Sequence, residues 1–234
     1  MLEIHTHTDS VSEEAIRSIA TPDSTESWHP IPHSLFLNQL KAALPVVDSA
    51  FALYRNGERF FGLLELENDE ESSLIVGLRN AHDRMFAAGI AIGNRFLTSN
   101  NLAFSSEIVI SRKHTRNILR DLPDCIQSAI PQIYEIQQKQ NQFYQTCKQY
   151  PLDEIHVHDF FIRTIDFGVI APSKLPRVLE DWRKEEDKTL WTAFHSIVNS
   201  LRGTTLWDQP RRTTALYNLC AVMIYDNMPH EIEV

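Results

Sequence analysis

A short polar stretch, placed directly after an apolar run, could carry acid–base chemistry. Asn80, His82 and Asp83 follow the run Ser73–Arg79. An imidazole takes up or releases a proton near neutral pH, and a neighbouring carboxylate can orient it or bind a metal ion. His82 and Asp83 are therefore the candidate catalytic residues. The alternative is a structural turn, because Asn and Asp side chains form hydrogen bonds with nearby backbone and favour turns.

A second polar set lies further along the chain and is suited to binding an anion. A guanidinium presents a planar fork of donors that matches a carboxylate or a phosphate. One interpretation places these side chains on one sheet face with Asn80, as an anion-binding or nucleic-acid-binding surface. The other is an internal network of ion pairs with Asp83. The candidate binding residues are Asn80, Arg95, Asn100, Asn101, Arg112, Lys113, His114 and Arg116.

The charge of the chain is unevenly distributed. The formal net charge is −9, from 31 acidic and 22 basic residues, whereas nucleic-acid-binding domains usually carry a basic surface. The segment Arg112–Arg120 is an exception, with four basic residues and no acidic one. It is either a solvated face or an electrostatic part of a binding surface. The acidic segments Glu65–Glu71 and Glu180–Asp187 allow a different hypothesis, in which a contiguous negative surface imitates DNA.

Tryptophan side chains could add stacking surfaces for bases. The residues concerned are Trp182, Trp191 and Trp207. Trp191 lies next to the apolar stripe of a predicted helix, and helical tryptophans usually belong to the core. We therefore favour a place in the core over a role in stacking.

No cofactor or metal ion is predicted. The chain has neither a Gly-rich phosphate loop nor a Gly-x-Ser-x-Gly turn. Cys125, Cys147 and Cys220 lie far apart without metal-ligand spacing, so reduced thiols are expected. On a strand, His5 and His7 would face the same side and could share a metal ion. They fall in a segment without further ligands, so a polar tail is the favoured interpretation.

Sequence patterns also limit the possible cellular compartment and the possible domain organisation. An apolar run of about 18 residues, as a membrane span needs, does not occur. The N-terminus lacks the apolar stretch of a signal peptide, so we expect a cytoplasmic protein. Residues 1–33 are expected to be loosely ordered, because Pro22, Pro30 and Pro32 interrupt helix formation. Residues 34–234 are expected to form a single domain.

The predicted elements change from strands to helices along this domain, with residues 46–115 rich in strands and 121–226 helical. Asn56-Gly57 is a strong signal for a hairpin, because both residues tolerate positive φ. After a helix at Leu35–Leu44, we predict strands at Phe51–Arg55, Arg59–Leu66, Ser73–Arg79 and Glu107–His114; Ala88–Leu97 is a strand or a small-residue helix. Helices are expected from Asp121 to about Tyr150 and at Asp153–Asp166, Ser173–Trp182, Lys188–Arg202 and Arg212–Tyr225. This order predicts an α+β fold, in which helices of the C-terminal half cover a mostly antiparallel sheet of the N-terminal half.

Three blocks of the chain resemble the phage- and plasmid-borne proteins of domain-of-unknown-function family 932. The blocks are Leu78–Thr115, with its Leu-Arg-Asn-Ala-His-Asp and Arg-Lys-His-Thr motifs, Asp166–Trp182 and Arg212–Asn218. The chain departs from the family pattern at Ala81, where Ser is expected, and at Asn100, where many members carry Cys or Asp. The family has no settled activity. The resemblance implies an origin in a phage, a plasmid or an integrated element.

These observations give one leading hypothesis of function and two alternatives. The leading one is a non-enzymatic accessory protein of a mobile element, which binds nucleic acid or a nucleic-acid-handling protein through the face carrying Arg95, Arg112 and His114. One alternative is a metal-assisted hydrolase or nuclease that uses His82 and Asp83. The other is an acidic DNA mimic that blocks a host defence protein. The sequence predicts no oligomeric state.

Overall fold

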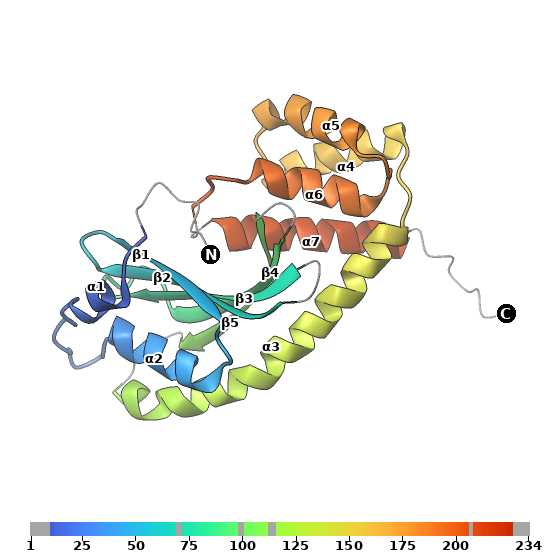
Figure 1. The fold of residues 1–234 in the computed structure, drawn as a ribbon. Helices are drawn as coiled ribbons and strands as arrows, with labels where there is room; N and C mark the ends of the chain where they lie inside the picture. The colour runs from blue at the N-terminus through green and yellow to red at the C-terminus, as the bar shows by residue number, and fades with distance from the viewer. Residues whose placement is uncertain (1–9, 69–71, 98–100, 112–115, 206–207, 227–234) are drawn as a thin grey trace.

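The computed structural model describes residues 10–68, 72–97, 101–111, 116–205 and 208–226 (Figure 1). A five-stranded sheet in the N-terminal half is combined with helices that dominate the C-terminal half, so the predicted α+β fold is confirmed. The strands are β1 (Asp48–Tyr54), β2 (Arg59–Asn68), β3 (Ser72–Ala81), β4 (Ala88–Phe96) and β5 (Asn101–Ser111). The helices are α1 (Glu13–Arg17), α2 (His33–Ala43), α3 (Ile118–Gln149), α4 (Glu154–Asp166), the 3-10 helix η1 (Pro172–Lys174), α5 (Leu175–Lys184), α6 (Leu190–Ser200) and α7 (Gln209–Asp226).

The sheet is an antiparallel meander in which the strands lie side by side in chain order. The predicted hairpin turn joins β1 to β2. Its residues Arg55, Asn56 and Gly57 have φ values of 50°, 55° and 90°, in the region that Gly and Asn tolerate best. The Gly57 amide closes the turn on the Tyr54 carbonyl at 3.1 Å. Local turn chemistry therefore sets the register of the first two strands.

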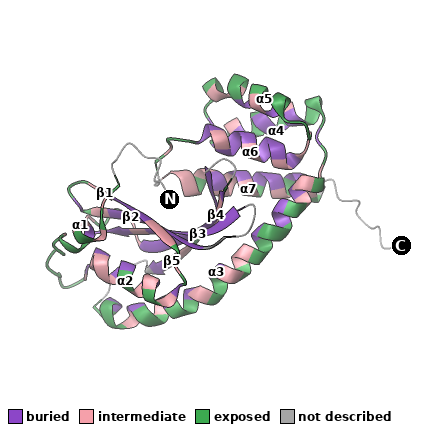
Figure 2. Cartoon of the chain, viewed as in Figure 1, coloured by how far each residue is buried: buried purple, intermediate pink, exposed green. Residues whose placement is uncertain are grey.

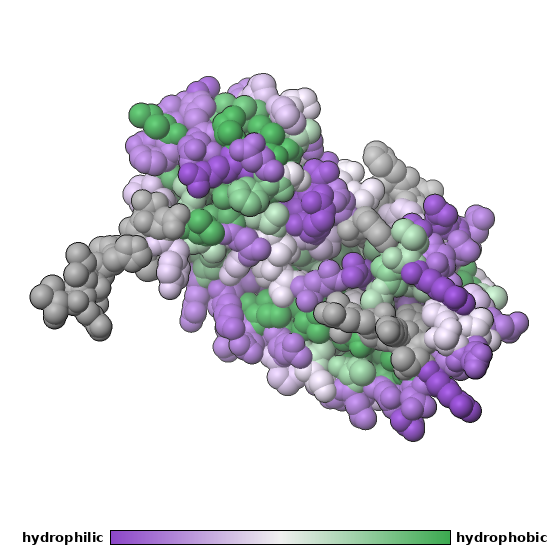
Figure 3. Space-filling model, turned by 180° about the vertical axis from the view of Figure 1, so that it is seen from behind, coloured by the Kyte–Doolittle hydropathy of each residue, from purple (hydrophilic) through white to green (hydrophobic). Residues whose placement is uncertain are grey.

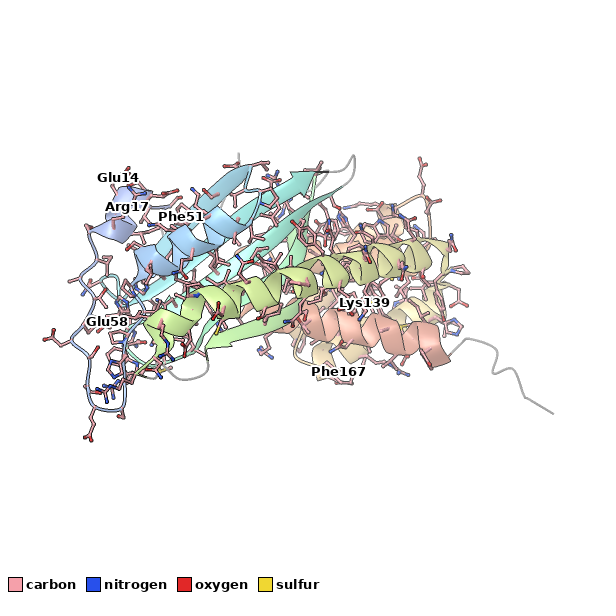
Figure 4. All side chains as sticks on the ribbon, turned by 90° about the horizontal axis from the view of Figure 1, so that it is seen from below. Glu14, Arg17, Phe51, Glu58, Lys139 and Phe167 are labelled. Atoms are coloured by element: carbon pink, nitrogen blue, oxygen red, sulfur yellow. The ribbon has the colours of Figure 1, made fainter. Side chains whose placement is uncertain are left out.

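Helices α2 and α3 cover one face of the sheet (Figures 1 and 4). Alternate residues of a strand point to the same face, and Leu74, Val76 and Leu78 of β3 all belong to the core beneath these helices. Ile126 and Ile133, two turns apart on α3, pack into the same core. Figure 2 shows the strands as largely buried, whereas the outer side of α3 is exposed.

The second half of α3 extends beyond the sheet and joins α4 to α7 in a helical lobe with its own core. Helix α7 also lies along β5, where its Thr213 hydroxyl accepts a hydrogen bond from the Phe104 amide at 2.9 Å. It thereby satisfies backbone groups of an edge strand. Figure 3 shows apolar surface on this lobe, broken up by hydrophilic residues. Its exposed large apolar side chains are Ile155, Ile162, Phe167, Val222 and Tyr225.

The N-terminal arm, defined here as residues 10–32, differs from the loosely ordered segment that we expected for residues 1–33. Its Ile16 and Ile31 are 1% and 0% exposed, and the Val11 amide donates to the Phe51 carbonyl of β1 at 2.9 Å. The prolines do prevent a long helix, but burial of two isoleucines holds the arm in place. Residues 1–9, including His5 and His7, lie outside the described residues.

Strand β5 begins at Asn101, six residues before the strand that we predicted at Glu107–His114. The early part is held because Leu102 and Phe104 are buried, at 4% and 2% exposed. The ambiguous segment 88–97 is a strand, β4. Its Gly93 is required by close packing, since a Cβ there would overlap the Ala103 carbonyl oxygen and lie 2.8 Å from the Phe104 Cα.

Among the helices that the structure describes, none combines the length and apolar character that a bilayer crossing requires.

Candidate functional site

The side chains of Asn80 and His82 belong to an internal hydrogen-bond network at the end of β3. The Asn80 side-chain amide donates to the Ile31 carbonyl at 2.7 Å and contacts His33 Nδ1 at 2.9 Å. His82 Nε2 lies 3.0 Å from the Ile31 carbonyl, and His33 Nε2 lies 2.9 Å from the Gly57 carbonyl. A carbonyl oxygen only accepts, so both Nε2 atoms carry hydrogen. His33 Nδ1 must then accept from the Asn80 amide, which makes His33 neutral.

The two imidazole rings of this network are stacked and buried. Their centroids are 3.8 Å apart with an interplanar angle of 5°, and His33 and His82 are 2% and 6% exposed. Burial lowers the pKa of His82 from its ordinary value of 6.5, against the opposing effects of the Ile31 carbonyl and of the Asp83 and Glu58 carboxylates. We call His33, Asn80 and His82 the sealed network.

Asp83 is occupied by partners of its own. Its Oδ2 accepts from Arg59 Nε at 2.6 Å, and its Oδ1 accepts from the Met85 amide at 3.1 Å. The side chains of Arg59 and Asp83 are 16% and 14% exposed. The pattern is that of a side chain that closes a turn. The arrangement supports the structural alternative for His82 and Asp83 over the catalytic one.

Arg95 lies far from Asn80 and faces the other side of the sheet. Arg95 pairs in register with Ser73, and Ser73 and Asn80 are seven residues apart on β3. An odd separation places two side chains on opposite faces, and seven residues span about 23 Å of strand. Arg95 forms an ion pair with Glu65, whose side chain is 2% exposed. The structure therefore does not place Arg95 and Asn80 on one shared face, and Arg95 is ion-paired with Glu65.

Of the other predicted binding residues, the structure describes Asn101 and Arg116, which lie in different places. Asn101 connects β5 to the end of α6, because its side-chain amide donates to Asn199 and its carbonyl accepts from Arg202 Nε at 2.7 Å. Arg116 is exposed just before α3. Asn100, Arg112, Lys113 and His114 lie outside the described residues.

A cleft of about 470 Å³ lies between α3 and α6, at the opposite end of the sheet from the Asn56-Gly57 turn. One wall is a polar stripe on α3, formed by Asn141, Tyr144, Gln145 and Lys148. These residues follow at intervals of three, four and seven positions, so they share one helix face. Ser72 at the start of β3 belongs to its floor and is 8% exposed.

The opposite wall is aromatic and begins at the N-terminus of α6. The Trp191 ring is partly exposed and meets the rings of Phe96 and Tyr144 edge-on, with centroids 5.2 Å apart in both cases. Lys148 Nζ lies 5.5 Å from the centre of the Trp191 ring, within range of a cation–π contact. The ammonium group thus lies over the Trp191 ring, and the ring also stacks on Phe194, with centroids 5.9 Å apart and an interplanar angle of 13°.

The start of α6 at the cleft is fixed by its own side chains. The Thr192 amide donates to the Thr189 hydroxyl at 3.3 Å, and the Thr189 amide donates to the Thr192 hydroxyl at 3.2 Å. This reciprocal cap holds the first turn in place. The Asp187 carboxylate stands at the rim, exposed.

Sequence reasoning missed this cleft. Trp191 was considered for stacking and assigned to the core; it packs against the core of the helical lobe and also lines the cleft. A signal was present in the chain, since Asn141, Gln145 and Lys148 form a polar stripe beside Tyr144 on a long helix. What the sequence lacked was the approach of α6 to that stripe.

In the described part of the acidic segments, several acids are paired with bases; Asp69, Glu70 and Glu71 lie outside the described residues. Glu65 is buried in its ion pair. On α5, Lys184 lies 2.7 Å from Glu180, and Arg177 lies 3.8 Å from Asp181. Acids and bases therefore alternate on this helix. Among the described residues, no group of three or more His, Cys, Asp or Glu side chains is arranged to hold a metal ion.

Comparison with known proteins identifies no relative: no family model, no curated protein and no solved structure matches the chain. The resemblance to family 932 stays a prediction.

Proposed function

We propose that the protein binds a nucleotide unit, without converting it chemically, in the cleft between α3 and α6. The observation that carries this proposal is the adjacency of the Trp191 ring and the Lys148 ammonium in a cleft of about 470 Å³. Pockets for small ligands typically range from about 300 to 1,000 Å³. The nucleic-acid part of our leading hypothesis is kept, while its surface moves from the sheet face to this cleft.

Each part of a nucleotide has a chemical counterpart in the cleft. A base that replaces the Lys148 ammonium over the Trp191 ring would gain about 1–3 kcal/mol from stacking. The amides of Asn141 and Gln145 carry both donors and acceptors, as base edges require. Lys148 and the positive end of the α6 dipole are suited to a phosphate. The Asp187 carboxylate at the rim opposes a second negative charge, which favours one phosphate over several.

A free mononucleotide and one residue of a single-stranded nucleic acid both carry the base and the single phosphate that this cleft fits. The net charge of −9 disfavours long contacts along a phosphate backbone. A cleft that takes a single unit is compatible with that charge. The setting of the protein in a phage, a plasmid or an integrated element is part of the proposal and rests on the resemblance alone.

The hydrolase alternative has less support. It requires the His82 imidazole to reach a substrate, whereas this ring is 6% exposed and its Nε2 is bonded to the Ile31 carbonyl. Asp83, the second residue of that hypothesis, is paired with Arg59.

The proposal is tested by calorimetric titration with mononucleotides, a short single-stranded oligonucleotide and its duplex. We expect saturable binding of the first two and none of the duplex, whose bases are already stacked. Lys148→Ala should weaken binding by about 10- to 150-fold, because a hydrogen bond to a charged group contributes about 1.5–3 kcal/mol. The matched control is Lys139→Ala, on the same helix but outside the cleft and paired with Glu135 (Figure 4).

Comparing the affinities distinguishes a free mononucleotide from one residue of a single strand as the natural ligand. Equal affinity for mononucleotide and oligonucleotide would assign the cleft to the free ligand, whereas much tighter binding of the oligonucleotide would assign it to single strands. Absence of binding by either at millimolar concentration contradicts the proposal. So does an equal loss of affinity in the Lys148 and Lys139 variants.

A further inference from the structure

We propose that His33 and His82 form a pH-sensitive clasp, which holds the N-terminal arm against the sheet at neutral pH and releases it on acidification. His82, at the end of β3, holds the Ile31 carbonyl of the arm at 3.0 Å. His33, the first residue of α2, holds the Gly57 carbonyl of the hairpin turn at 2.9 Å. The two rings stack on each other between these anchors. The clasp is independent of the cleft.

The hydrogen bonds and the stacking of His33 and His82 fit neutral rings and disfavour protonated ones. A proton on His33 Nδ1 would point at the Asn80 side-chain nitrogen, 2.9 Å away, which is itself a donor. Two imidazolium rings with centroids 3.8 Å apart would repel each other strongly in a buried site. A charge on His33 would also lie at the N-terminus of α2, where the helix dipole is positive.

The charged groups around the clasp act in both directions. The Asp83 and Glu58 carboxylates favour a charged His82, but burial outweighs them and lowers the pKa of this ring. Asp83 is moreover paired with Arg59 at 2.6 Å. Arg84 lies over the Trp28 ring of the arm, 4.5 Å from its centre, and adds a positive charge to the region.

The pH range follows from these groups. A histidine in the released arm state titrates near its ordinary value of about 6.5, and the closed state binds its proton less readily. The closed state is therefore fully stable above about pH 6.5 and loses stability as the pH falls below that value. The arm is also held by other contacts, which include the buried Ile16 and Ile31 side chains, the Val11 amide on the Phe51 carbonyl and the Glu13–Lys41 ion pair.

Release of the arm would change the surface at one edge of the sheet. The arm lies beside the β1–β2 hairpin, with α1 close to β1 (Figures 1 and 4). Strand β1 is an edge strand, and the arm occupies its Phe51 carbonyl. Opening would also uncover Gly57, against which the Ile19 side chain packs.

The clasp is tested through Trp28, whose ring belongs to the arm. Subtracting the fluorescence of a Trp28→Phe variant isolates the signal of this residue, and circular dichroism establishes that the rest of the protein stays folded. Between pH 8 and pH 5 we expect a red shift of the Trp28 emission with a midpoint below 6.5. A constant emission over this range, in a folded protein, would overturn the proposal.

Variants decide whether the two rings cause the transition. In His33→Gln/His82→Gln the amide groups can still donate to the carbonyls but do not titrate, so the transition should be lost. If the double variant does not fold, His82→Gln alone should move the midpoint to lower pH. His29→Gln, in the same arm but outside the stack, should leave the midpoint unchanged. A midpoint unaltered by His82→Gln, or a transition abolished by His29→Gln, would assign the response to other groups.

Discussion

Two polar regions, at opposite ends of the sheet, differ in what their side chains contact. In the sealed network, Asn80 and His82 are 0% and 6% exposed, and their hydrogen bonds go to the Ile31 carbonyl of the N-terminal arm and to the His33 ring. In the cleft, Gln145 and Asn141 are exposed, and Lys148 is partly exposed beside an aromatic ring. The first region follows a core strand, whereas the second lies on a helix face and has room for a ligand.

The difference has an energetic cause. A buried donor or acceptor without a partner costs about 1–3 kcal/mol, so a polar residue on a core strand recruits internal partners. Polar groups at the wall of an open cleft stay in water and pay no such penalty. A concentration of Asn, His and Asp after a core strand is therefore a better sign of a sealed network than of a binding site.

The largest effect is expected where a charge is sealed inside the sheet. Arg95→Ala should lower the free energy of unfolding by about 3–5 kcal/mol, because it leaves the Glu65 carboxylate buried without its partner. Denaturant titration measures this loss. Arg163→Ala, which breaks an exposed pair with Asp159 on α4, should cost no more than about 0.5 kcal/mol. Equal losses in the two variants would show that Glu65 regains water.

An intermediate effect is expected in the sealed network. Asn80→Ala should lower the free energy of unfolding by about 1–3 kcal/mol, since His33 Nδ1 and the Ile31 carbonyl each lose a hydrogen-bond donor. Nucleotide affinity of the folded protein should not change. A loss of affinity at unchanged stability would return Asn80 to the list of binding residues and break the comparison.

The smallest effect on stability is expected in the cleft, where binding should change instead. Gln145→Ala and Asn141→Ala remove exposed side chains from α3 and should alter the free energy of unfolding by less than about 0.5 kcal/mol. Each should weaken nucleotide binding severalfold in calorimetric titration. If neither changes affinity while Lys148→Ala does, the cleft recognises the phosphate and not the base.

Much of the fold was predictable because its signals are local. The Asn56-Gly57 turn, the alternation of Leu74, Val76 and Leu78, and the apolar stripe of α6 each indicate an element from neighbouring residues alone. Errors arose where distant contacts decide. The arm was judged by its prolines, although Ile16 and Ile31 anchor it, and the start of β5 depends on packing against α7.

The amino-acid sequence by itself determined the strands, the helices and their α+β order, because hydrophobic periodicity and turn chemistry act over a few residues. Only the tertiary structure decided which polar groups share a site. It joined His82 to Ile31 across 51 positions of the chain and turned Arg95 toward Glu65. It also brought the stripe of α3 to Trp191. Such pairings depend on which surfaces meet when the helices pack. The periodicity within one helix or strand does not predict which other element will pack against it.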